Sequence, residues 1–187
     1  MNNSKDTVLQ EKITPKEEYG MKVRGEVIDK IYKNGKLVQT IESHNLVVNK
    51  FLELILALLK EESGYGGIQY WAVGDGSSSW DDTLPSPTLN DTQLTSEIGR
   101  VAILASDLTF LNDDYTESAI PTHILQIKHT FGTADCNGSW REFGIFGGTA
   151  TASANRGVML DRRTHALITK TSEMTVERTL RFILSLT

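Results

Sequence analysis

The chain has 187 residues, a formal net charge of −5, and 39% hydrophobic against 23% charged residues. This is the composition of a globular domain with one substantial core. A net negative chain lacks the basic surface that neutralises phosphates, so we expect no nucleic-acid partner. The single cysteine, Cys136, excludes an intrachain disulfide, as is usual for a chain folded in a reducing compartment.

The first 20 residues alternate charges and contain few large apolar side chains. Such a segment cannot bury enough apolar surface to order itself. We therefore expect residues 1–20 to form a flexible or docking arm, and residues 21–187 to form a single domain. The segment has no apolar core of the length that a secretory signal needs, so export is not expected.

Two runs rich in Val and Ile follow the arm, at 21–32 and 37–43. Asn34 and Gly35 lie between them and favour a tight turn, because both tolerate the left-handed backbone that such turns need. The sequence therefore predicts a β-hairpin.

The next run has apolar residues at helical spacing and predicts a helix over roughly 46–61, ended by the glycine-rich "SGYGG". Leu54 and Leu56 widen its apolar stripe, so we expect a helix that is covered on most sides. It is too short and too charged to cross a bilayer, and no membrane contact is expected.

A long polar segment with two prolines, residues 77–97, predicts a loop that serves as a functional or interaction surface. Strand-like runs then recur to the end of the chain. In the last of them one face is expected to carry Val176, Leu180, Phe182, Leu184 and Leu186. Many strands, frequent turns and one helix predict a mainly β fold: an antiparallel β-sandwich with one packed α-helix and an extended N-terminal arm.

Candidate catalytic and metal sites are weak. Asp75, Asp81 and Asp82 could offer oxygen ligands to Ca²⁺, but their spacing fits no established calcium loop, and a turn explains the glycines around Asp75. The four histidines are scattered, and no serine lies in a G-x-S-x-G elbow. We expect no enzyme activity, no bound metal and no cofactor.

Charge is distributed unevenly along the chain. Nine acidic residues and one basic residue lie between Asp75 and Glu117, whereas six basic and three acidic residues lie between Arg156 and Arg181. Two hypotheses remain open. The regions neutralise each other within one fold, or the acidic face of one copy meets the basic face of the next in a head-to-tail ring.

Five segments in order resemble tailed-bacteriophage structural proteins of the tail-collar fibre and baseplate or neck type: "NLVVNKFLELI", "IQYWAVGDGSS", "LTSEIGRVAI", "WREFGIFGG" and "NRGVMLDR". In that family an N-L-V segment opens a helix and a strand ends in a V-G-x-G turn. An L-x-x-E-x-x-R element and an E-x-G-[IL]-F strand follow, and a last strand ends near an arginine. In this chain the elements fall at 45–47, 73–76, 94–100, 142–146 and 158–162.

The resemblance implies a non-enzymatic virion protein, made in the host bacterial cytoplasm. It would assemble into a symmetric homo-oligomer at the tail, collar or neck, or baseplate, with other phage proteins as partners and fibre anchoring as one role. The candidate structural and interaction residues are Asp75, Gly76, Glu97, Arg100, Trp140, Arg141, Glu142, Gly144, Phe146 and Arg162.

The motif residues also suggest a structural role on physical grounds. Glu97 and Arg100 on one short element, with Arg141 and Glu142 on a strand, are expected to form ion pairs that hold the acidic loop against the sheet. Gly144 is expected to allow close approach of another backbone or ring. "WREFGIFGG" is thus predicted to be a packing and anchoring strand that ends in a tight turn.

An alternative function is a receptor- or carbohydrate-binding module of the phage adsorption apparatus. This hypothesis needs exposed aromatic side chains that stack on sugar rings. The candidates for that role are Tyr70, Trp71, Trp80 and Trp140.

Overall fold

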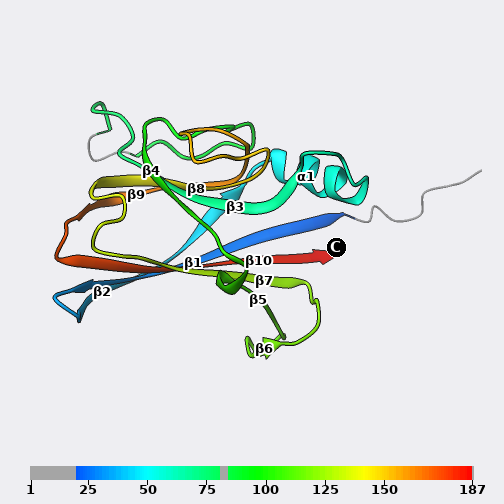
Figure 1. Cartoon of the computed structure of the whole chain (residues 1–187), viewed down its shortest axis with the longest axis horizontal. Helices are drawn as coiled ribbons and strands as arrows, with labels where there is room; N and C mark the ends of the chain where they lie inside the picture. Colours follow the sequence, from blue (N-terminus) through cyan, green and yellow to red (C-terminus); the bar gives the residue numbers. More distant parts are fainter. Residues whose placement is uncertain (1–19, 81–83, 187) are drawn as a thin grey trace, which may run out of the picture.

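The computed structural model describes residues 20–80 and 84–186 (Figure 1). The chain is mainly β, as predicted. Its elements are β1 (Met21–Lys33), β2 (Lys36–Val47), α1 (Lys50–Leu59), β3 (Gly66–Gly74), β4 (Glu97–Ala102), η1 (Ala105–Asp107), β5 (Leu108–Leu111), β6 (Glu117–Ser118), β7 (Ile124–Phe131), β8 (Gly138–Gly148), β9 (Val158–Lys170) and β10 (Met174–Leu186). The predicted arm, apart from Gly20, lies outside the described residues.

The ten strands of the described residues form one antiparallel sheet in the order β4-β3-β8-β9-β2-β1-β10-β7-β5-β6. The sheet is narrow where β2 pairs with β9, because this pairing joins only Leu46 and Val47 to Arg162 and Asp161. The sheet folds over at this point, so that β3, β4, β8 and β9 lie above β1, β7 and β10 (Figure 1). The layers of the expected sandwich are therefore compatible with the structure, but they are halves of one continuous sheet.

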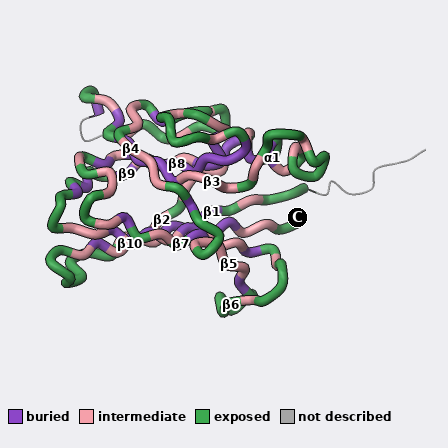
Figure 2. Tube along the Cα trace, viewed as in Figure 1, coloured by how far each residue is buried: buried purple, intermediate pink, exposed green. Residues whose placement is uncertain are grey.

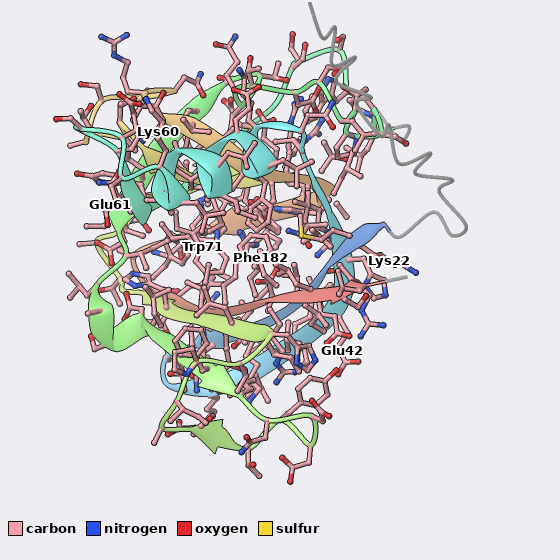
Figure 3. All side chains as sticks on the ribbon, turned by 90° about the vertical axis from the view of Figure 1, so that its right-hand side faces the viewer. Lys22, Glu42, Lys60, Glu61, Trp71 and Phe182 are labelled. Carbon is pink, nitrogen blue, oxygen red and sulfur yellow. The ribbon has the colours of Figure 1, made fainter. Side chains whose placement is uncertain are left out.

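The main core lies between the two halves. Phe131 of β7 packs edge-on against Trp71 of β3 and Trp140 of β8, with ring centroids 6.2 and 5.0 Å apart. All three rings are fully buried. Trp71 and Phe182 lie between the halves in Figure 3. Because one cluster draws side chains from both halves, its burial holds the folded sheet closed.

The predicted hairpin is confirmed. Asn34 and Gly35 both have positive φ, +49° and +74°, and they join β1 to β2. The strand-like run from 99 to 111 is not one strand: it contains parts of β4 and β5, separated by the short helix η1.

The expectation that the helix is covered on most sides is wrong. Leu46 and Val47 belong to β2, and α1 begins only at Lys50. Two of its residues are buried, Phe51 and Leu54. The helix lies at one end of the molecule, beside the start of β1 and the end of β10, and much of it faces solvent (Figures 1 and 2). In the described part of the chain, no helix is long and apolar enough to cross a membrane.

The core also contains an ion pair that the sequence reading missed. Arg178 lies on the inward face of β10, between Val176 and Leu180, and is fully buried. Its Nε and Nη2 donate to the carboxylate of Asp29, at 2.5 and 2.8 Å. The guanidinium carbon also lies 4.1 Å from the ring centroid of Phe143, a cation–π arrangement. Two-point pairing and aromatic contact offset the cost of burying the charge.

Gly144 confirms the predicted close approach of another backbone. A Cβ built on Gly144 would lie 2.8 Å from the carbonyl oxygen of Asp161 on the neighbouring strand.

We therefore expect Gly144→Ala to lower the free energy of unfolding by about 1–3 kcal/mol, the usual cost of overpacking. Gly67→Ala is the control, since no atom lies within 4 Å of its Cβ position. Equal denaturation midpoints for the two variants would contradict this account.

Candidate functional site

The residues that carry the phage resemblance are divided between the inner and outer faces of the β4-β3-β8-β9 half. Alternation along β8 turns Phe143 and Ile145 into the main core. It turns Phe146 outward into a second, smaller core, which also contains Val48, Ala72, Leu94 and Met159. We call the four charged residues on this face, Glu97, Arg100, Glu142 and Arg162, the ion-pair brace.

The first half of the brace is the predicted pair of Glu97 and Arg100. Arg100 Nε and Nη2 donate to the two carboxylate oxygens of Glu97, at 2.6 and 2.7 Å. Both side chains are almost fully buried, and the guanidinium carbon lies 4.6 Å from the ring centroid of Phe146. Because it is desolvated and two-pronged, this pair is unlike an exposed ion pair, which contributes little.

The same pair holds the loop between β8 and β9. Arg100 Nη1 donates to the carbonyl oxygens of Thr151 and Arg156, at 2.7 and 3.0 Å. The backbone N–H of Asn155 donates to Glu97 at 2.7 Å, while the Asn155 side chain accepts from the N–H of Leu94 at 2.9 Å. Two segments far apart in sequence are thus fixed to each other.

The second half of the brace differs from the prediction. Glu142 pairs with Arg162, whose Nη2 lies 2.6 Å from Glu142 Oε2, and Arg141 instead donates to the carbonyl oxygen of Trp80. The reason is the strand register. Gly144 is opposite Arg162, so Arg162 is a diagonal neighbour of Glu142 on the same face.

Arg162 and Glu142 also hold the end of the long loop. Arg162 Nη1 donates to Asp91 at 2.9 Å, and the N–H of Ser96 donates to Glu142 Oε1 at 2.9 Å. Burial acts to raise the pKa of Asp91, but hydrogen bonds from Thr88 and Arg162 outweigh it and hold the pKa below its ordinary value. The predicted role of the ion pairs in placing this loop is consistent with these contacts.

Asp75 and Gly76 lie at the turn after β3. The N–H of Asp75 donates to the carbonyl of Ser96 at 3.0 Å, and a side chain at Gly76, where φ is +71°, would collide with the Trp80 ring. A polar hollow of about 400 Å³ lies beside this turn and is lined in part by Asp75, Ser96 and Arg141. Asp81 and Asp82 lie outside the described residues, and within residues 20–80 and 84–186 no cluster of metal-ligating side chains occurs.

The aromatic residues of the carbohydrate alternative are not available for stacking. Trp71 and Trp140 are fully buried, and Trp80 is 8% exposed. Trp140 Nε1 donates to the carbonyl oxygen of Cys136 at 2.7 Å. Tyr70 is partly covered by Arg100, whose guanidinium carbon lies 5.4 Å from its ring centroid. These side chains serve packing, as aromatics in β cores often do.

The charge distribution favours neutralisation within the fold. Arg162 binds two carboxylates, and Arg178 is buried on Asp29. Lys170 is also buried, with its ammonium 2.6 Å from the carbonyl oxygen of Gly132. Three of the six cations between Arg156 and Arg181 are therefore used inside the molecule, so this segment presents less basic surface than its sequence suggests.

The sequence reading did not predict the exposed apolar surface on α1. Leu52, Leu56, Leu58 and Leu59 are all exposed. Beneath the helix an apolar hollow of about 370 Å³ opens between α1, β3, β5 and β7; its lining includes Leu58, Ile68 and Phe110. The sequence contained an indication of this exposed surface. Eight of the ten α1 residues are apolar, and contact with one sheet buries only about one stripe of a helix.

The brace yields a stability prediction. Arg162→Ala leaves the carboxylate of Glu142 buried without its cation, and we expect it to lower the free energy of unfolding by roughly 3 kcal/mol. Hydrogen exchange of the Ser96 backbone amide should accelerate, because Arg162 no longer holds the Glu142 carboxylate that accepts its hydrogen bond. Arg24→Ala is the control: this arginine is half-exposed in its pair with Glu26 and should cost less than about 1 kcal/mol. Similar losses for both variants would contradict the brace.

A second prediction concerns pH. Asp161 is fully buried, and burial raises the pKa of its carboxyl to about 7, despite hydrogen bonds from Ile145 and Asn45. The folded state therefore keeps a proton that the unfolded state loses above about pH 4, and the stability from Asp161 falls as pH rises from about 4 through 7.

Asp161→Asn removes this titration. Its stability relative to the native chain should rise between pH 5 and 7, by up to about 1.4 kcal/mol per pH unit. Chemical denaturation at several pH values measures the difference. Burial lowers the pKa of the His165 imidazole to about 4. Because both proteins contain this histidine, its pH-dependent contribution to stability cancels in the comparison. A difference that does not change with pH would contradict the prediction.

Comparison with known proteins gives no relative from which to transfer a function. The chain matches no protein family, no curated protein and no solved structure.

Proposed function

We propose that this chain is a non-enzymatic structural subunit of a tailed-bacteriophage particle. In this proposal, copies assemble into a symmetric homo-oligomer at the tail, collar or neck, or baseplate. Other phage proteins are its further partners, with fibre anchoring as one role. The protein is made in the host bacterial cytoplasm and ends in the virion.

The observation that carries the proposal is the exposed apolar surface of α1. Four leucines on a ten-residue helix face solvent, whereas the tryptophans Trp71, Trp80 and Trp140 are buried. Contiguous apolar surface of this kind is typical of protein–protein contact. A subunit that gains stability by association accounts for it, because covering these side chains removes apolar area from water.

The resemblance supplies the second support. The motif residues at 94–100 and 142–146 act as architecture in the described structure, since Glu97 and Glu142 hold two loops on one face of the sheet. Braced loops of this kind present a fixed outer surface to a neighbour. The buried tryptophans give no support to the carbohydrate-binding alternative, and the internal use of Arg162, Lys170 and Arg178 leaves fewer cations for a charged head-to-tail contact.

Self-association is the direct test. We expect the sedimentation coefficient of the purified chain to rise with concentration in both low and high salt, because apolar burial is not screened as exposed charges are. Sedimentation velocity measures this. A coefficient that stays at the monomer value over the whole concentration range in both buffers would contradict the proposal.

The arm has its own test within the same proposal. Deleting residues 2–18 is expected to leave the domain folded but to impair its incorporation into particles, because a polar arm orders itself only on a neighbour's surface. The denaturation midpoint of the variant checks the fold, and quantitative blotting of purified particles checks incorporation. Normal incorporation would contradict a docking role for the arm.

A further inference from the structure

The apolar residues of α1 occupy two sides of the helix. Phe51 and Leu54 face the sheet and are buried. Leu52, Leu56 and Leu59 point elsewhere, with 43, 66 and 77% of their surface exposed. Their spacing of four and then three residues places them on one stripe. This spacing is also the repeat with which two helices pack side by side.

The stripe is accessible to a large partner. In Figure 3, which looks at the end of the molecule, α1 runs across the upper part and no described strand lies in front of it. In Figure 2 much of the helix is coloured as exposed. Lys60 and Glu61, labelled in Figure 3, mark the C-terminal end of the helix.

The charges at the two ends of α1 favour a second copy as the occupant. Lys50 is the first residue of α1, whereas Glu62 lies three residues beyond its last, Leu59, after the left-handed turn at Glu61. Two α1 helices that pack antiparallel, with Leu56 on the two-fold axis, bring each Lys50 toward the end of the partner helix that Glu61 and Glu62 follow. A parallel pair would instead bring like charges together at both ends.

Helix dipoles favour the same direction, since each positive N-terminus then lies beside a negative C-terminus. The present partners of these charges do not oppose the pairing. Lys50 binds Glu53, and Glu62 binds Lys60, within the same chain. These side chains are exposed, and exposed pairs of this kind exchange at little cost.

We propose that α1 of one copy packs antiparallel against α1 of a second copy, with Leu52, Leu56 and Leu59 of each helix forming the shared seam. This inference rests on the proposed homo-oligomer and specifies one of its contacts. The seam is short, because α1 has ten residues. It is therefore a weak contact by itself and adds to others in an assembly, where linked weak contacts reinforce one another.

Cysteine crosslinking tests the two-fold axis. In a Cys136→Ser background, Leu56→Cys is expected to form a disulfide-linked dimer under mild oxidation, because the two residues face each other. Leu37→Cys is the matched control: Leu37 is also an exposed leucine, but it lies in the hairpin strand β2. If the Leu56→Cys variant crosslinks at least about tenfold faster than the Leu37→Cys variant, the result supports the seam. Equal crosslinking rates for the two variants would overturn it.

A charge-reversal cycle tests the direction. Lys50→Glu and Glu62→Lys should each weaken self-association in sedimentation velocity, by several-fold at low salt. The double variant should return it toward the native value, because the antiparallel pair again opposes unlike charges. Failure of the double variant to recover would overturn the antiparallel arrangement.

Leu56→Asp separates this inference from the proposed function. The residue is exposed, so the variant should fold with an unchanged circular dichroism spectrum while its association constant falls at least about tenfold. Leu37→Asp should keep the native association constant. If the native chain associates and Leu56→Asp associates equally, the α1 seam is wrong and the homo-oligomer stands. If the native chain never associates, both are wrong.

Discussion

The fold depends on the burial of aromatic side chains between two halves of one sheet. Trp71, Phe131 and Trp140 lie where the halves face each other, and none of the three is exposed. The backbone ladder alone does not hold the halves together, since β2 and β9 pair over only two residues of each strand. The closed shape therefore rests on apolar burial, which is non-directional and roughly proportional to the area covered.

The charged groups are arranged around that apolar frame. Arg178 and Asp29 pair inside the core, while Glu142 and Arg162 pair on its outer side beneath the loops. Buried ion pairs contribute little net stability, but the loss of one partner is costly. Their effect is to determine which loop lies where, because few other positions would satisfy these charges.

The helix α1 exposes several large apolar side chains on one short element. The sheet covers one side of α1 and leaves a second leucine stripe in water. An isolated helix of this length is marginal, and contact with the sheet accounts for its order. In the assembly that we propose, a second subunit covers this stripe.

The sequence by itself determined the local features of this protein. Strand periodicity predicted a mainly β chain, Asn34 and Gly35 predicted the hairpin, and the lack of a Cβ at Gly144 predicted the approach of a neighbouring backbone. Each of these depends on residues close together in the chain. The pairing of Glu97 with Arg100, three residues apart, was predictable for the same reason.

Only the tertiary structure decided which distant residues meet. The partner of Glu142 is Arg162 and not Arg141, because strand register brings together residues that are twenty positions apart. The burial of Arg178 depends on Asp29, which comes from the other end of the chain. The exposure of α1 depends on how much of its apolar surface a single sheet face covers. Such contacts arise from packing between elements, and local pattern does not encode them.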